Sequence, residues 1–192
     1  MKKVSVFCGS SSKVPGKFFR EAELLGRILA RENISIFFGG GDFGLMGNVA
    51  KGAMEERGHV TGVIPQFMVD AGWAHKGVDD LVVVKNMHER KYKLIHETDG
   101  IVTLPGGFGT LEELSEAITS KQLGLITVPI IFVNINGYFD HLLDFFSSML
   151  DDNFIRPAHL NMWSVIPDVS GVIQALHKAP GWDANVIGMA KI

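Results

Sequence analysis

Cysteine is nearly absent from this sequence, since Cys8 is the single one among 192 residues. One cysteine excludes an internal disulfide and a cysteine-based zinc cluster, and it is typical of proteins in a reducing compartment. Long apolar runs are lacking too, because no segment approaches the roughly 18 apolar residues of a membrane span. The apolar stretch after Lys2 and Lys3 is also too short for a signal peptide. We therefore expect a soluble, cytoplasmic protein.

An excess of charge of one sign is also missing. The chain has 18 basic and 21 acidic residues, which leaves a net charge of −3. A general nucleic-acid binder would need clustered basic residues to neutralise phosphates. We therefore expect no nucleic-acid partner and no membrane partner, and any anion site must be local. With 46% hydrophobic residues, the chain has ample apolar surface for a folded core,.

Short β-branched runs alternate with longer amphipathic segments, a pattern typical of βαβ units around a parallel sheet. We expect one α/β domain over residues 1–192, with a Rossmann-like, doubly wound, mainly parallel sheet and helices on both faces. Residues 179–192 are expected to form an irregular tail. The expected strands are 4–8, 35–38, 60–64, 81–84, 100–104 and 129–133, and the expected helices are 18–32, 45–57, 88–98, 110–123, 139–151 and 169–177.

Glycine is unusually common, with 22 residues where average usage near 7% would give about 13. Three glycine-bearing segments, 8–12, 39–47 and 105–110, follow predicted strands. Ligands of open α/β sheets bind at these strand ends, where helix N-termini offer free N–H groups to phosphate. Tight turns alone are the competing explanation for each segment. The three together favour an anion-binding, nucleotide-binding edge.

The second segment contains G-x-G-x-x-G at Gly39, Gly41 and Gly44, which suggests a dinucleotide site. However, the motif follows the second strand, and no acidic residue stands about 20 positions later to bind the ribose. The sequence G-x-x-x-x-G-K-[ST] of a P-loop is absent. NAD binding and nucleoside triphosphate hydrolysis are therefore not expected.

Charged residues flank the third glycine segment on both sides. Arg90 and Lys91 open a predicted helix, where an adjacent anion would relieve their unfavourable interaction with the helix dipole. They fit equally well as solvated charges paired with Glu89 or Glu97. Glu113 is a candidate acid, base or cation stabiliser.

The same segment also has a purely structural interpretation, because Thr110 and Glu113 fit a capping box at the start of a helix. The seven histidines are scattered and form no H-E-x-x-H motif, so we expect no metal site,. Cys8 ends a buried strand and is expected to be a packing residue.

Several segments together resemble the Lonely Guy family of cytokinin riboside 5′-monophosphate phosphoribohydrolases, which were long mislabelled as lysine decarboxylases. Residues 105–113 match the family motif P-G-G-x-G-T-x-x-E. Three further segments are similar to the family in order and spacing: 39–47, with G-G-G-x-x-G-L-M-G, 87–91, with M-H-E-R-K, and 134–138, with N-I-N-G-Y. The resemblance covers residues 3–167.

The resemblance implies hydrolysis of the N-glycosidic bond of an adenosine-type 5′-monophosphate, such as AMP or N6-substituted AMP, to the free base and ribose 5-phosphate. It also implies a homodimer whose neighbouring helices complete the pocket, and no metal or organic cofactor. At the matching positions Arg90 and Glu113 would be catalytic. Together with the glycine segments, it predicts these substrate-binding residues: Gly9, Ser10, Gly40, Gly41, Met87, Lys91, Gly106, Gly107, Gly109, Thr110, Glu112 and Thr119.

A different class of function stays open beside this one, a non-catalytic nucleotide or molybdenum-cofactor carrier with the same architecture. Two positions also depart from the family's pattern. Gly72 stands where an acidic residue is common, and Ser120 stands where tryptophan is common. The sequence leaves open which base is preferred and whether the reaction serves cytokinin production or nucleotide salvage.

Overall fold

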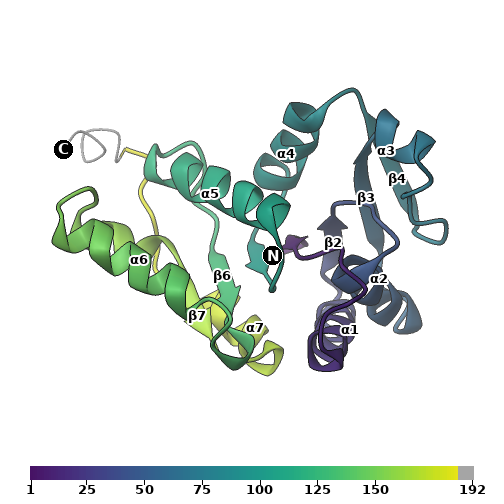
Figure 1. Cartoon of the computed structure of the whole chain (residues 1–192), viewed down its shortest axis with the longest axis horizontal. Helices are drawn as coiled ribbons and strands as arrows, with labels where there is room; N and C mark the ends of the chain where they lie inside the picture. The colour runs from purple at the N-terminus through teal and green to yellow at the C-terminus, as the bar shows by residue number, and fades with distance from the viewer. Residues whose placement is uncertain (186–192) are drawn as a thin grey trace.

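The computed structural model, which describes residues 1–185, is built on a seven-stranded parallel sheet in the order β4-β3-β2-β1-β5-β6-β7 (Figure 1). This confirms the predicted Rossmann-like α/β fold. The strands are β1 Lys3–Phe7, β2 Ser35–Phe38, β3 Val60–Pro65, β4 Asp80–Val84, β5 Ile101–Thr103, β6 Ile130–Val133 and β7 Ser164–Ile166. Sequence reasoning missed β7, an edge strand of three residues. So short a run carries almost no periodicity.

The α-helices lie between the strands, as predicted, apart from one that sequence reasoning missed. They are α1 Gly16–Arg31, α2 Gly44–Glu55, α3 Gln66–Asp70, α4 Met87–His96, α5 Phe108–Gln122, α6 Asp140–Asp151 and α7 Val172–Lys178. Short 3₁₀ turns occupy Ile135–Gly137, Pro157–Met162 and Val169–Gly171. The missed helix, α3, has five residues and no buried side chain, so it lacks the apolar face that marks a longer helix.

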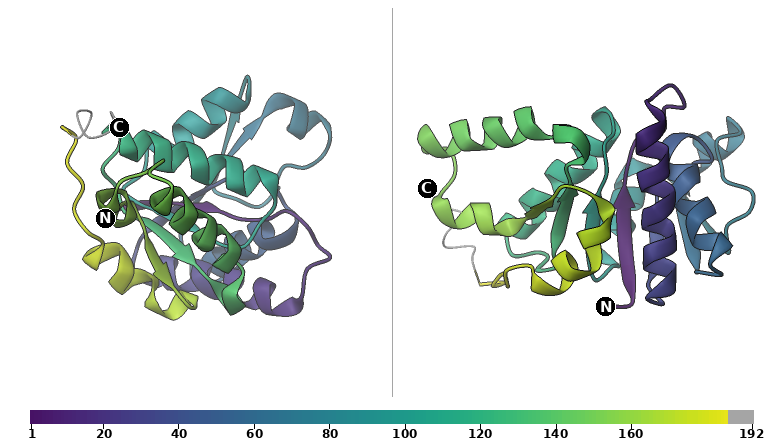
Figure 2. Two further views of the ribbon diagram at one scale, coloured as in Figure 1. Left: turned by 60° about the vertical axis from the view of Figure 1, so that its left-hand side comes forward. Right: turned by 90° about the horizontal axis from the view of Figure 1, so that it is seen from below.

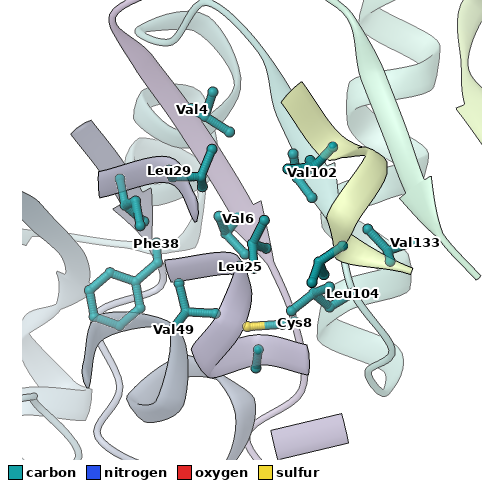
Figure 3. Packing of buried hydrophobic residues seen from close by; sticks show 14 of the residues in the cluster. Val4, Val6, Cys8, Leu25, Leu29, Phe38, Val49, Val102, Leu104 and Val133 are labelled. Atoms are coloured by element: carbon teal, nitrogen blue, oxygen red, sulfur yellow. The ribbon is translucent and has the colours of Figure 1, made fainter. Parts of the chain in front are cut away.

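Each face of the sheet carries its own hydrophobic core. Helices α1, α2 and α7 pack on one face, and α4, α5 and α6 pack on the other. In Figure 3, Leu25 and Leu29 of α1 lie against Val4 and Val6 of β1. Figure 2 shows α1 running alongside β1. Because helices cover both faces, the inner strands are apolar almost continuously rather than alternating.

The strand order reverses between β1 and β5, and this reversal positions the site. The chain first proceeds from β1 through β2 and β3 to β4, then returns to place β5 on the other side of β1. A doubly wound sheet leaves a crevice at such a point, outside the carboxyl ends of the strands. The glycine-bearing segments after β1, β2 and β5 all open onto this crevice.

Helices α1 and α2 pack unusually closely because glycines replace side chains at their contact. A Cβ atom at Gly52 would overlap the carbonyl oxygen of Glu23, and one at Gly26 would overlap the carbonyl oxygen of Val49. Part of the glycine excess therefore serves helix packing rather than ligand binding.

The described part of the C-terminal tail, residues 179–185, forms no helix or strand. It lies against the end of α5, where the Trp182 Nε1–H donates to the Lys121 carbonyl at 2.6 Å. The rest of the predicted irregular tail, residues 186–192, falls outside the described residues. Among residues 1–185, no helix is long and apolar enough to cross a membrane.

Replacing Gly52 with alanine is expected to destabilise the protein by about 1–3 kcal/mol, the usual cost of overpacking. The new methyl group would overlap the Glu23 carbonyl of α1. Urea unfolding followed by circular dichroism measures the effect. Gly16→Ala in α1 is the control, because its Cβ would meet only the Arg20 guanidinium at 3.5 Å. Equal stability of Gly52→Ala and the wild type would contradict the close helix contact.

Candidate active site

A pocket of about 480 Å³ opens at the crevice between β1 and β5. Its walls come from the ends of β1 and β3, from the segments after β1, β2 and β5, and from the first turns of α2, α3, α4 and α5. Most of the predicted site residues line it: Gly9, Ser10, Gly41, Met87, Arg90, Gly107, Gly109, Thr110 and Glu113.

The third glycine segment forms the N-terminus of α5, which begins at Phe108 rather than at Thr110 as predicted. Gly107 is the N-cap residue, and no side chain caps the helix. The predicted capping box is therefore wrong, because Thr110 lies inside the first turn and packs on Gly106. The first N–H groups of a helix have no partner within it. Here they border an open pocket, which makes them available to an anion.

The other glycine segments bring the backbone of β1 and β2 to the same pocket. The Leu45 N–H donates to the Gly9 carbonyl at 2.9 Å and joins the two turns. Gly44, with φ of 64°, leaves no room for a Cβ atom against Ser10. Gly41 lines the pocket, whereas Gly40 lies beneath it against Ile64 and adopts a φ of 75°.

Arg90 is buried, so its interpretation as a solvated helix charge is wrong. Its Nε–H donates to the Val63 carbonyl at 3.1 Å and an Nη2–H donates to the Gly39 carbonyl at 3.0 Å. Nη1 lies 3.5 Å from a carboxylate oxygen of Glu113. A Cβ atom at Gly39 would overlap Nη2. Glycine at that position is therefore a steric condition for the placement of Arg90.

Glu113 points from α5 towards Arg90 and is 7% exposed. Burial raises the pKa of this carboxyl from its ordinary 4.5 to about 7, although the Arg90 charge opposes the shift,. A carboxyl group of this kind exists in both protonation states near neutral pH. Such tuning is typical of acid–base and charge-stabilising groups in active sites.

Some predicted site residues lie away from this pocket. Lys91 is buried but pairs with Glu112 at 2.9 Å and Glu116 at 2.6 Å, and these carboxylates raise its pKa. Thr119 is exposed on α5, and its hydroxyl donates to the Ser115 carbonyl at 2.8 Å. Gly106 borders two smaller cavities instead.

The pocket also has an apolar end that sequence reasoning missed. This end follows β2 and β3 and is lined by Phe43, Met46, Ile64, Met68 and Trp73. Trp73 is 49% exposed, more than a core residue would be. Its position next to the unpredicted helix α3 explains why no motif revealed it. The available sequence signal was the placement of two aromatic residues, Phe43 and Trp73, outside the predicted strands and helices, since loops frequently carry binding residues,.

Cys8 lines the pocket floor without offering a nucleophile. The thiol is buried, and burial raises its pKa far above neutrality. A thiol is nucleophilic as the thiolate. Among residues 1–185, no cluster of three His, Cys, Asp or Glu side chains is arranged to hold a metal ion.

The fold and site define a doubly wound α/β protein in which a helix N-terminus without a side-chain cap lies beside a buried Arg–Glu pair. A family model described as "Possible lysine decarboxylase" matches residues 46–176. The chain is 37% identical over 190 residues to cytokinin riboside 5′-monophosphate phosphoribohydrolase LOG5 of Arabidopsis thaliana, covering 99% of this chain and 83% of that protein. It is 38% identical over 177 residues to the probable enzyme LOGL9 of rice, Oryza sativa subsp. japonica, covering 92% and 78%. The chain belongs to the Lonely Guy (LOG) family.

Solved structures with this fold include carriers of a cofactor. The molybdenum cofactor carrier protein of Chlamydomonas reinhardtii superposes with a TM-score of 0.71 at 22% identity, over 93% of this chain and 97% of that one. The molybdenum cofactor binding protein of Rippkaea orientalis superposes with a TM-score of 0.66 at 19% identity, over 90% and 93%. At these identities the likeness concerns the fold alone.

Glu113→Gln is expected to gain stability relative to the wild type as the pH rises from 4.5 to 8, by roughly 2–3 kcal/mol. Between pH 4.5 and 7 the unfolded chain loses this proton before the folded chain does, so the wild type becomes less stable. The glutamine variant has no proton to lose at this position, so its stability does not fall in this way. Urea unfolding of both proteins at pH 4.5 and at pH 8 measures the difference in the free energy of unfolding.

Glu32→Gln changes an exposed carboxylate and is the matched control, for which we expect no comparable gain. A stability difference between Glu113→Gln and the wild type that stays constant with pH would show that Glu113 is not a buried titrating group.

Proposed function

We propose that this protein hydrolyses the N-glycosidic bond of adenosine-type nucleoside 5′-monophosphates, releasing the base and ribose 5-phosphate. The observation that carries the proposal is the buried Arg90–Glu113 pair next to the free N-terminus of α5. Membership in the LOG family supports it, because the named relatives carry this activity in their names. The cytoplasm stays the predicted location.

The order of the strands suggests how the substrate lies. Neighbouring strands are about 4.8 Å apart, so the edge from β5 to β3 spans roughly 14 Å. The N–H groups after β5 suit the 5′-phosphate, and the apolar side chains after β2 and β3 suit the base. Met68 and Trp73 would contact the base, and an apolar N6 substituent would add contacts with the same side chains. Arg90 and Glu113 then lie beside the ribose.

The proposed reaction breaks the bond between ribose C1′ and the base nitrogen, and both electrons leave with the base. Water then forms a bond to C1′, and the proton that it loses ends on the base. The ionised Glu113 would stabilise the positive charge on the ribose and orient the water. Arg90 would hold the carboxylate in place, and no step in this scheme requires a metal or an organic cofactor.

A carrier would bind the nucleotide without turnover. The buried Arg90–Glu113 pair in the pocket favours catalysis over carriage, because a paired carboxyl group with a pKa raised to about 7 suits acid–base or charge-stabilising chemistry,. The carriers with this fold share too little sequence to alter this preference.

We further propose that the protein is a homodimer formed through α5 and α6. Large apolar side chains are exposed on or beside these helices: Phe108, Leu125, Phe145 and Phe154 are 92%, 64%, 56% and 71% exposed. Large apolar side chains that are exposed on neighbouring helices mark an interaction surface. Thr119, which the family resemblance places at the substrate, is exposed on α5, so it can line a site only if another chain packs there.

Sedimentation velocity is expected to give twice the 21.0 kDa mass of one chain. Phe145→Glu should shift the protein towards the monomer, because a charge would be buried in the contact. The same change at an exposed aromatic residue that lies on α4 rather than on α5 or α6, Tyr92→Glu, should not. A wild-type monomer throughout the micromolar range would contradict the dimer.

Incubation with AMP or N6-isopentenyl-AMP is expected to release free base, which chromatography detects. Glu113→Gln should lower kcat by roughly 100- to 1000-fold, as expected when one preorganised charge stabiliser is removed. Because the ionised carboxyl is the active form, the wild-type rate should rise with pH through about 7.

Glu32→Gln should retain full activity. Folded wild-type protein that releases base from neither nucleotide would overturn the proposed function, and stoichiometric binding without release would favour a carrier.

A further inference from the structure

The segment Asn134–Tyr138, between β6 and α6, contributes nothing to the main pocket. It nevertheless contacts the glycine segment that forms the phosphate end of that pocket. The Tyr138 hydroxyl donates a hydrogen bond to the Gly106 carbonyl oxygen at 2.6 Å.

All of the carbonyl groups in the turn at residues 105–107 accept hydrogen bonds. The Pro105 carbonyl accepts from the Gly9 N–H at 3.0 Å, and the Gly107 carbonyl accepts from the Leu111 N–H at 3.0 Å. Both of these donors are backbone groups. The Gly106 carbonyl between them is the one held by a side chain.

The orientation of this carbonyl determines where the next N–H points. A peptide unit is planar and trans, so the Gly106 C=O and the Gly107 N–H point in opposite directions. Gly106 borders the two smaller cavities on the Tyr138 side and does not border the main pocket, whereas Gly107 borders all three. If this peptide turned over, a carbonyl oxygen would face the anion and repel it.

Local structure holds Tyr138 in this position. The Asn134 side chain accepts from the Phe139 N–H and donates to Asp140, each at 2.7 Å. Asn136 and Gly137 adopt φ angles of 55° and 70°, and they turn the chain sharply before the tyrosine. Asparagine and glycine tolerate this left-handed region best.

The tyrosine ring is held as well as its hydroxyl. It packs edge-on against Phe18 of α1 and against Phe139, with ring centroids 5.9 and 5.1 Å apart. Tyr138 therefore connects three separate parts of the chain at the glycine turn. Phenylalanine would keep these ring contacts and lose only the hydroxyl.

We propose that Tyr138 is a positioning residue for the phosphate site, where its hydroxyl fixes the Gly106–Gly107 peptide with the Gly107 N–H facing the pocket. The inference rests on the proposed function for the nature of the anion, a 5′-phosphate. It deepens that function by assigning a role to the motif N-I-N-G-Y.

Calorimetric titration of Tyr138→Phe with ribose 5-phosphate tests the proposal without requiring turnover. The dissociation constant is expected to rise about 3- to 10-fold, the consequence of losing one neutral hydrogen bond that orders the site. Adenosine lacks the phosphate, so its dissociation constant should not change. The unfolding midpoint should remain close to that of the wild type.

The chain offers a matched control in its second tyrosine, since Tyr92 is 59% exposed on α4 and borders none of the three cavities. Tyr92→Phe should bind both ligands like the wild type. Unchanged ribose 5-phosphate binding by Tyr138→Phe, or equal weakening for ribose 5-phosphate and adenosine, would overturn the assignment.

The same titrations separate this inference from the proposed function. If the wild type binds ribose 5-phosphate but hydrolyses no nucleotide, the hydrolase proposal fails, and the comparison of binding still decides the role of Tyr138. If the wild type does not bind ribose 5-phosphate, the anion site is wrong and the role of Tyr138 is overturned with it.

Discussion

The site depends on one buried charge, the guanidinium of Arg90. A buried cation is costly unless it is paired and hydrogen-bonded. Arg90 meets this condition with the carbonyls of Gly39 and Val63 and with the carboxylate of Glu113. These partners come from the ends of β2 and β3 and from α5. The charge thus links α4, on which it lies, to the sheet edge and to the opposite wall of the pocket.

The protonation of Glu113 follows from the same pairing. Burial alone would hold the carboxyl neutral, whereas the adjacent cation favours the carboxylate. The opposing effects leave the pKa at about 7. Both the protonated and the ionised form of Glu113 are therefore populated near neutral pH. Keeping this carboxyl group buried lowers the stability of the folded chain at and above that pH.

The glycine turns complete the site by exposing backbone donors rather than side chains. Turning the carbonyls of residues 105–107 to other partners leaves N–H groups facing the pocket. A phosphate can then be bound without a basic surface, which agrees with the near-neutral charge of the chain,. Under the proposed function, three roles would be separated along the edge: anion binding after β5, chemistry at Arg90 and Glu113, and apolar contact with the base after β2 and β3.

The sequence by itself determined the sheet, its main helices and the glycine-rich edge, because periodicity and turn residues are local signals. It also singled out Arg90 and Glu113. Only the tertiary structure decided that these two meet, that Lys91 pairs with Glu112 and Glu116 instead, and that Thr110 caps no helix. Short elements such as α3 and β7, and the apolar end near Trp73, carry too little local pattern to predict. Burial and partner choice arise between segments far apart in the chain, and no local pattern records them.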